Sequence, residues 1–180
     1  MQHLIEIDRF WFYLINHSGN ENWDEFMLFA THKLSWIPLY ALLVAIIIYT
    51  KKKKSVWILL TTIIVISCCD LGSVHLFKNV FERLRPCHVL ENVRLVTEGC
   101  GGYYGFVSSH ASNVFGLAIV LGKLSENRML FLTLLLWASV VSFSRVYVGV
   151  HYPSDILGGM MWGTFVALIG VKTYTFFTQK

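Results

Sequence analysis

The sequence predicts an all-α fold, a membrane-embedded bundle of six helices of which about five span the bilayer. Of the 180 residues, 55% are hydrophobic and only 14% are charged, whereas soluble domains carry about 25% charged residues. The mean hydropathy is correspondingly high, at +0.56. Five apolar runs, each of roughly 17–22 residues with its flanks, are long enough to cross a hydrocarbon layer of about 30 Å.

The elements follow from the order of these runs. Residues 1–18 mix charged side chains with large apolar ones, and this predicts an amphipathic helix that lies in the membrane interface. The apolar runs predict spanning helices over residues 26–50, 55–77, 106–122, 129–146 and 154–176. Because no linker or repeat interrupts the chain, we expect a single integral-membrane domain over 1–180.

The basic loop Lys51–Lys54 sets the expected orientation, because short basic loops stay on the cytoplasmic side. Since spans alternate in direction, the loop over 78–105 and the segment over 145–155 both fall on the opposite face. The outer loop contains Cys87 and Cys100. In an oxidising compartment these two residues could form a disulfide, and two free thiols are the alternative.

Three polar segments meet at this outer face, and the first is KNVFERLRP, from Lys78 to Pro86. Lys78 and Arg85 are seven residues apart and would share a helix face if the second span continued to Arg85, where Pro86 would end it. A basic collar at a helix end is the alternative interpretation. We expect Glu82 to pack locally or to pair with Arg83.

The second segment, VSSHAS, opens the third span at residues 107–112. Its serines can cap the helix, and the free N–H groups at a helix start also bind phosphate. His110 would then lie in the first turn, beside such an anion. A plain cap with an interfacial histidine is the alternative.

The third segment, SRVYVGVHYPSD, covers residues 144–155. His151 and Asp155 are four residues apart, which makes them neighbours on a helix or its first turn, and Pro153 suits a helix start. Arg145 supplies a planar cation suited to phosphate oxygens. A buried salt bridge is the alternative, but ionisable groups at membrane depth are costly and usually functional.

Together these segments predict a phosphoryl-transfer site. Cationic side chains stabilise negative charge on the phosphoryl oxygens. One histidine can attack phosphorus, and the other can protonate the leaving oxygen and then activate water. The residues alone do not decide which of His110 and His151 attacks.

The chain resembles the type 2 phosphatidic acid phosphatase superfamily, the integral-membrane lipid phosphate phosphatases, whose motifs are K-x6-RP, PSGH and SR-x5-H-x3-D. Here the motifs read Lys78–Arg85–Pro86, Val107–Ser108–Ser109–His110 and Ser144–Arg145–His151–Asp155, within a motif-bearing core over 55–175. The third motif matches in full. The second has Val107 in place of proline and Ser109 in place of glycine, so the detail of the phosphate pocket stays open.

The resemblance assigns a role to each motif residue. It implies that His151 is the nucleophile and forms a phosphohistidine, that Asp155 orients it, and that His110 is the general acid and then the base. The phosphate-binding groups would be Lys78, Arg85, Ser108, the amide of Ser109, and Arg145. It also implies no cofactor and no metal, in keeping with the absence of a close-spaced ligand cluster among the seven histidines.

The expected function is a multi-pass lipid phosphatase of the bacterial inner (cytoplasmic) membrane, with its active site facing the periplasm or outside. Candidate substrates are undecaprenyl diphosphate, phosphatidylglycerophosphate and lipid A phosphates, and the short chain favours the first. Its partners would be the lipid substrate and the bilayer, with no nucleic acid. Two alternatives are a vanadate-dependent haloperoxidase, which shares the anion pocket but is soluble, and a non-catalytic lipid-phosphate binding or transport protein.

Overall fold

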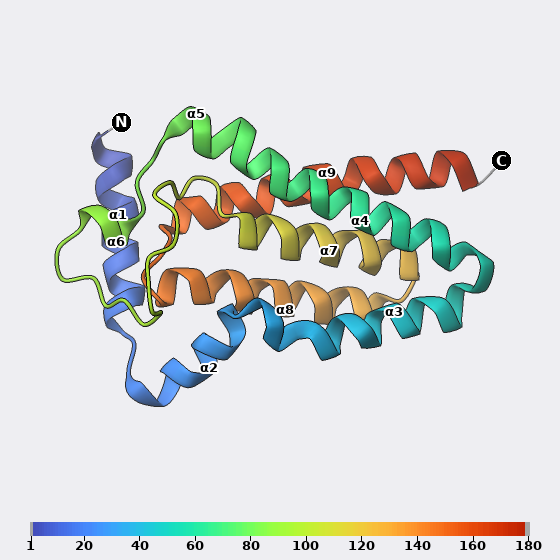
Figure 1. Ribbon diagram of the computed structural model, residues 1–180, viewed down its shortest axis with the longest axis horizontal. Coiled ribbons are helices and arrows are strands. Elements are labelled where there is room, and N and C mark those ends of the chain that lie inside the picture. The colour runs from blue at the N-terminus through green and yellow to red at the C-terminus, as the bar shows by residue number, and fades with distance from the viewer. Residues whose placement is uncertain (1, 179–180) are drawn as a thin grey trace.

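The computed structural model describes residues 2–178, so Met1 and residues 179–180, which the expected domain includes, lie outside the described part. Within that part the regular structure is almost entirely helical, and the only strand-like feature is an isolated bridge between Leu84 and Tyr104. The long helices lie alongside one another in an elongated bundle (Figure 1). The predicted all-α class is therefore confirmed.

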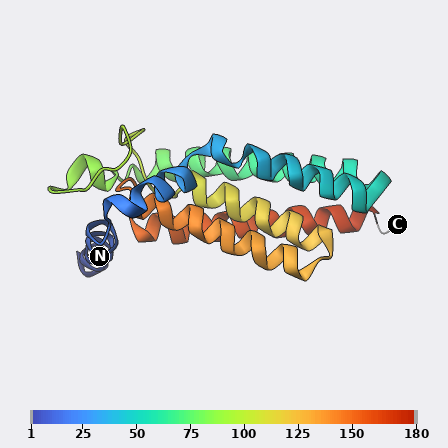
Figure 2. The same cartoon turned by 90° about the horizontal axis from the view of Figure 1, so that it is seen from below.

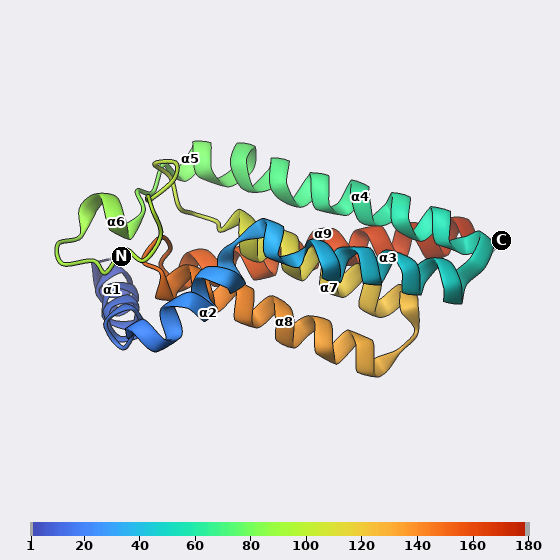
Figure 3. The same ribbon diagram turned by 60° about the horizontal axis from the view of Figure 1, so that its bottom comes forward.

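Five helices form the bundle. Figures 2 and 3 show the bundle from two further directions. The five helices are α3 (Ile37–Lys51), α4 (Ser55–Gly72), α7 (Ser109–Ser125), α8 (Arg128–Tyr147) and α9 (Pro153–Thr178). Helix α7 packs against α4, α8 and α9. Most of its residues are buried, because α7 is the element that the other helices surround.

Three stretches of the described chain are long and apolar enough to cross a membrane. The first includes both α3 and α4, and the other two are α8 and α9. Their bounds are Lys33–Phe81, Arg128–Tyr147 and Pro153–Thr178. Helix α7 begins at Ser109 and ends at Ser125, close to the expected third span.

The start of the expected first span over 26–50 is wrong, because the chain breaks at His32 and the candidate span begins at Lys33. Helix α2 (Glu21–Thr31) ends at an extended His32, and the 3-10 turn η1 (Lys33–Trp36) leads into α3. Pro38 stands in the first turn of α3. Proline is tolerated at a helix start but breaks the hydrogen-bond ladder in a helix interior, so a continuous helix through this position is disfavoured.

The second span also ends differently from the prediction. Helix α4 continues through a π-helical turn, η3 (Ser73–Lys78), into α5 (Asn79–Phe81), and Glu82 then adopts a left-handed conformation with φ 46°. Such a residue commonly ends a helix. Lys78 and Arg85 therefore do not share a helix face, and Pro86 begins the short helix α6 (Pro86–Val89) instead of ending α5.

Helix α1 (Gln2–His17) confirms the helix expected at the N-terminus. It crosses one end of the bundle (Figure 1), where Phe12 and Asn16 are fully buried. The Asn16 amide donates to the carbonyl oxygens of Arg94 and Tyr147, both at 2.8 Å. Large apolar side chains of α1 are exposed, including Leu4, Phe10, Trp11 and Leu14. The location of α1 in a membrane interface stays a prediction.

The basic loop and the polar segments lie at opposite ends of the bundle. Lys51 donates to Glu126 at 2.7 Å, which joins the turn η2 (Lys52–Lys54) to the connection between α7 and α8. Helices α1 and α6 and the loop that follows α6 lie at the other end (Figure 1). This is the separation that alternating spans predict.

Two glycines of α9 allow close contact with α7. A Cβ on Gly159 would lie 2.4 Å from the Ser108 carbonyl oxygen, and one on Gly163 would lie 2.1 Å from the Ser112 carbonyl oxygen. Both neighbours are backbone atoms, so the helices would have to move apart. The small-residue pair is thus a helix-packing feature, as in other membrane helices.

We predict that Gly163→Ala destabilises the detergent-purified protein by roughly 1–3 kcal/mol, the usual cost of overpacking. The measurement is the midpoint of thermal unfolding. Gly102→Ala is the matched control, because nothing lies within 4 Å of a Cβ at Gly102. Equal midpoints for the two variants would contradict the close α7–α9 contact.

Candidate active site at one end of the bundle

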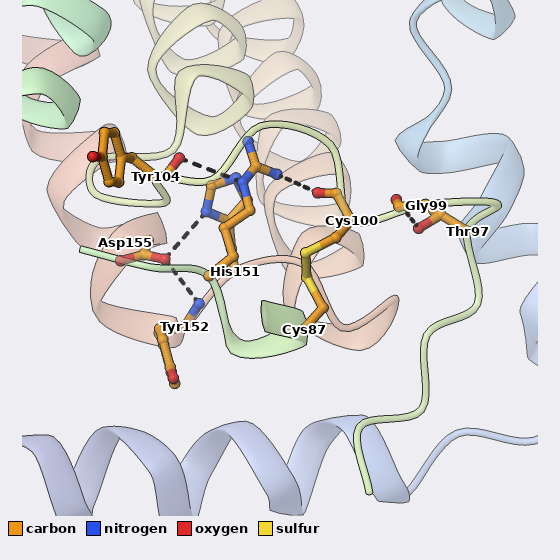
Figure 4. Close-up of a disulfide and its surroundings, with 9 residues drawn as sticks. Cys87, Thr97, Gly99, Cys100, Tyr104, His151, Tyr152 and Asp155 are labelled. Carbon is orange, nitrogen blue, oxygen red and sulfur yellow. Dashed lines mark hydrogen bonds and ion pairs between the residues drawn. A yellow bond between two sulfur atoms is a disulfide. The ribbon is translucent and has the colours of Figure 1, made fainter. Parts of the chain in front are cut away.

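His151 and Asp155 form a buried pair at the start of α9. His151 lies in the connection between α8 and α9 and is 1% exposed, and Asp155 lies in the first turn of α9 and is 0% exposed. The Asp155 Oδ2 atom accepts hydrogen bonds from His151 Nδ1 at 3.2 Å and from the Tyr152 backbone N–H at 3.0 Å (Figure 4). A carboxylate on Nδ1 fixes the ring tautomer and leaves Nε2 free to act as a nucleophile.

The surroundings of His151 favour its neutral form. Burial lowers the pKa of His151 well below its ordinary value, and the charges of Arg85 and Arg145 lower it further. Desolvation disfavours the charged imidazolium, and nearby cations repel it. The ring therefore carries a free lone pair near neutral pH.

Arg85 is held by backbone carbonyl groups of the long outer loop. It is buried, and its guanidinium donates to the Cys100 oxygen at 3.1 Å and to the Tyr104 oxygen at 3.4 Å. Cys100 forms a disulfide with Cys87, which lies two residues after Arg85 (Figure 4). The disulfide therefore joins the segment that carries Arg85 to the loop whose carbonyl groups bind it. The structure thus selects the disulfide of the two alternatives for these cysteines.

Arg145 lies near the end of α8 and is held by the end of α2. Its Nη1 atom donates to the Thr31 hydroxyl. Its Nε atom is buried and has no hydrogen-bond partner within the described residues. A buried donor of this kind is costly unless it is paired, and a phosphate oxygen is an acceptor that suits it.

The second motif places two serines at the start of α7. Ser108 is the N-cap residue, and its hydroxyl accepts from the Ala111 N–H at 3.5 Å. The Ser109 hydroxyl accepts from Lys78 Nζ at 2.8 Å and lies 2.5 Å from the Ser73 hydroxyl. The side chain that replaces glycine in the motif therefore holds Lys78 at the site, which the sequence left open.

His110 lies in the first turn of α7 and is partly buried. It interacts electrostatically with Arg145, Lys33 and His151. The three segments singled out in the sequence thus converge at one end of the bundle, with both histidines in range of the same cations. The helix start, the cations and the histidine–carboxylate pair give an arrangement that can bind an oxyanion and attack its central atom.

Four residues at the site were not predicted from the sequence. Arg83 bonds to Asp8 and Asp155 rather than to Glu82, and Thr31 and Lys33 lie beside Arg145 and His110. The one signal in the sequence for Asp8 and Arg83 is that each is an ionisable residue near an apolar segment. Their separation in the sequence does not indicate that they are in contact. Among the residues that the structure describes, no group of three His, Cys, Asp or Glu side chains is placed to hold a metal ion.

A groove of about 470 Å³ leads away from His110 along α7. Its lining is mostly apolar, and the polar exceptions are Thr31, Lys33, Thr62, His110 and Asn113. The apolar part comes from α3, α4, α7 and α8 and includes Tyr40, Val44, Ile63, Leu117 and Trp137. The groove reaches Leu121, which lies eleven positions beyond His110 on α7, or roughly 16 Å at 1.5 Å per residue.

Comparisons with known proteins agree with this geometry. The PAP2 superfamily model matches residues 55–179. A lipid A 4'-phosphatase of Bacteroides thetaiotaomicron is 32% identical over 92% of this chain and 76% of its own length. An undecaprenyl-diphosphatase of Sulfolobus acidocaldarius is 31% identical over 89% of this chain and 75% of its own length.

A solved structure shares the fold. The crystal structure of a transmembrane PAP2-type phosphatidylglycerolphosphate phosphatase from Bacillus subtilis superposes with a TM-score of 0.75 at 23% identity. The match covers 99% of this chain and 89% of the other. The family model, the relatives and the fold lead to one conclusion: the chain belongs to the PAP2 superfamily.

Proposed function

We propose that this chain, a membrane phosphatase of the PAP2 superfamily, hydrolyses a phosphate or diphosphate group carried by a lipid, with His151 as the nucleophile. The observation that carries the proposal is the buried His151–Asp155 pair, which lies within electrostatic range of Lys78, Arg85 and Arg145. A neutral imidazole beside three cations suits attack on a bound phosphoryl group.

The proposed reaction has two steps. His151 Nε2 attacks phosphorus, the bond from phosphorus to the leaving oxygen breaks, and His110 donates its proton to that oxygen. Neutral His110 then takes a proton from water, the water oxygen attacks phosphorus, and the phosphorus–nitrogen bond breaks to release inorganic phosphate. Arg85, Arg145 and the helix start at Ser108 and Ser109 would stabilise the charge on the phosphoryl oxygens.

The groove beside His110 supports a lipid substrate. Lys33 and His110 line the groove together with many apolar side chains, so it suits a molecule that joins a charged head group to a hydrocarbon chain. Candidate substrates are lipid A phosphates, undecaprenyl diphosphate and phosphatidylglycerophosphate. The two curated relatives described above act, by their names, on the first two.

The placement in the cell is part of this proposal. The proposed active site lies at the end of the bundle opposite Lys52–Lys54, and the positive-inside rule would put that basic turn in the cytoplasm. We infer a single integral-membrane domain in the inner membrane, with the site at its periplasmic or outer face. The Cys87–Cys100 disulfide is consistent with an oxidising compartment on that side.

We predict that His151→Ala abolishes phosphate release from a lipid phosphate. Asp155→Asn should lower the rate by roughly a thousandfold or more, as replacing the carboxylate of a catalytic histidine does elsewhere. The assay is phosphate release by detergent-purified protein from a panel of the three candidate lipids. Release by His151→Ala at the wild-type rate would refute the assignment.

The same assay tests the two alternative functions. If the wild type releases phosphate from no lipid but keeps its fold, a binding protein is favoured, whereas bromide oxidation with added vanadate would favour the haloperoxidase.

The pH dependence should be bell-shaped. Because the pKa of His151 is lowered, its ring stays neutral and nucleophilic down to a lower pH than an ordinary histidine, whose pKa is about 6.5. Activity should therefore fall on the acid side only well below that value. On the basic side it should fall once His110 loses the proton that the bound phosphate anion would help it to keep. The measurement is kcat/KM as a function of pH. An acid limb centred at about pH 6.5 or higher would contradict a lowered pKa of His151.

We predict that Val44→Trp partly fills the groove. Val44 is 41% exposed and lines the groove from α3, so the bulkier side chain can enter it without disturbing the core. The expected result is a loss of about tenfold in kcat/KM for a long-chain lipid phosphate, equivalent to about 1.4 kcal/mol, and little change for a short-chain analogue. Val56→Trp is the control, because Val56 is also exposed but lies outside the groove. Equal losses for both chain lengths would contradict this use of the groove.

A further inference from the structure

The N-terminal helix reaches the catalytic pair through a continuous ionic network. We propose that Asp8 of α1, acting through Arg83, is a positioning residue that holds Asp155 and thereby His151 in the reactive orientation. The inference rests on the proposed function and deepens it. It makes α1 a working part of the active site, in addition to an element that covers one end of the bundle.

Arg83 is the centre of the network, and its two terminal nitrogens serve different partners. Its Nη1 atom donates to Asp155 Oδ1 at 3.0 Å and to the Ser154 hydroxyl at 2.5 Å. Its Nη2 atom donates to Asp8 Oδ2 at 2.5 Å. The guanidinium also lies over the Tyr152 ring, 4.1 Å from its centroid. A planar fork with fixed donors is the group that can bridge two carboxylates in this way.

Asp155 uses its two oxygens for two separate tasks. Oδ2 accepts from His151 and from the Tyr152 backbone, whereas Oδ1 accepts from Arg83. A fully buried carboxylate needs a countercharge, and neutral His151 supplies none. Arg83 is the cation in direct contact with Asp155 in the part of the chain that the structure describes. Its position therefore sets the angle at which Oδ2 faces the imidazole.

Asp8 in turn holds Arg83 and the start of α9. Its Oδ2 atom accepts from Arg83 and from the Ser154 hydroxyl at 2.5 Å, and its Oδ1 atom accepts from the Ser154 backbone N–H at 2.9 Å. Ser154 is the second residue of α9, where N–H groups lack helical partners and the helix dipole favours an anion. Asp8 is 8% exposed, so it is committed to these contacts.

The network matters most during the first chemical step. As His151 Nε2 bonds to phosphorus, positive charge develops on the ring, and Asp155 must stay ionised and in line with Nδ1 to stabilise it. Neither Asp8 nor Arg83 forms or breaks a covalent bond. Their effect should therefore appear in kcat and in the tautomer of His151, with little effect on substrate binding.

A second ion pair provides a matched control. Asp24 of α2 bonds to Arg94 in the outer loop and accepts from the Tyr147 hydroxyl at 2.9 Å. Like the Asp8–Arg83 pair, it ties an N-terminal helix to the outer loop with partly buried side chains. Within the described residues, neither member of this pair forms a hydrogen bond or ion pair with Asp155 or His151. Losing it removes a similar structural link without touching the catalytic pair.

The experiment uses the full-length protein in detergent and compares Asp8→Asn, Arg83→Gln and Arg83→Lys with Asp24→Asn. Thermal unfolding, kcat and KM are measured with a lipid phosphate that the wild type hydrolyses. Asp8→Asn should lower kcat about tenfold and Arg83→Gln about a hundredfold. This is the range found in metalloproteins for residues that hydrogen-bond to a metal ligand and orient it. KM should change little. Arg83→Lys should recover part of the loss, since it keeps the charge but not the fork.

A spectroscopic readout keeps the test independent of turnover. Nitrogen-15 spectra of histidine-labelled protein, with His151 assigned by comparison with His151→Ala, should show a single tautomer protonated at Nδ1 in the wild type and in Asp24→Asn. Asp8→Asn should show a mixture of tautomers. If the wild type hydrolyses no lipid phosphate, the proposed function fails and the tautomer result alone decides the positioning role.

Three results would overturn the inference. The first is a folded Asp8→Asn protein with wild-type kcat. The second is an Asp24→Asn protein that loses as much kcat as Asp8→Asn for an equal loss of thermal stability. The third is an unchanged His151 tautomer in Asp8→Asn.

Discussion

The fully buried carboxylate of Asp155 is the constraint on which the rest of the site depends. A charged group without access to water must be surrounded by donors, and here the donors come from two separate parts of the chain. His151 and Tyr152 come from the connection before α9, and Arg83 from the segment after α5. Satisfying this one group therefore fixes how the start of α9 and the segment after α5 meet, and the proposed anion site forms around them.

The apolar bundle and the polar end each position a different part of the proposed site. Helix α7 is buried along most of its length and is capped by Ser108 at the polar end, so its packing sets the position of the helix start that we propose binds phosphate. The disulfide-bonded loop holds Arg85 in place, because the Arg85 guanidinium donates a hydrogen bond to the Cys100 carbonyl oxygen. The parts of the site are thus attached to the packed core or to a covalent bridge.

Local patterns in the sequence predicted the features that local physics controls. The apolar runs indicated the long helices, the four-residue spacing of His151 and Asp155 indicated their contact, and Ser108 indicated the helix cap. The break at His32 and the helix end at Glu82 were not predicted, because apolar content continues past the first and a single left-handed residue makes the second. The contact between Asp8 and Arg83 joins residues 75 positions apart, and no local rule can link them.

The groove beside His110 opens at the side of the bundle, since Val44 and Ile63 in its lining are exposed on α3 and α4. A substrate that enters there arrives by two-dimensional diffusion within the leaflet and need not leave the lipid phase. The quantity that sets the degree of saturation is then the mole fraction of substrate among the surrounding lipids, and its concentration in the bulk solution matters little. Dilution with inert lipid or detergent would act on such an enzyme as substrate depletion acts on a soluble one.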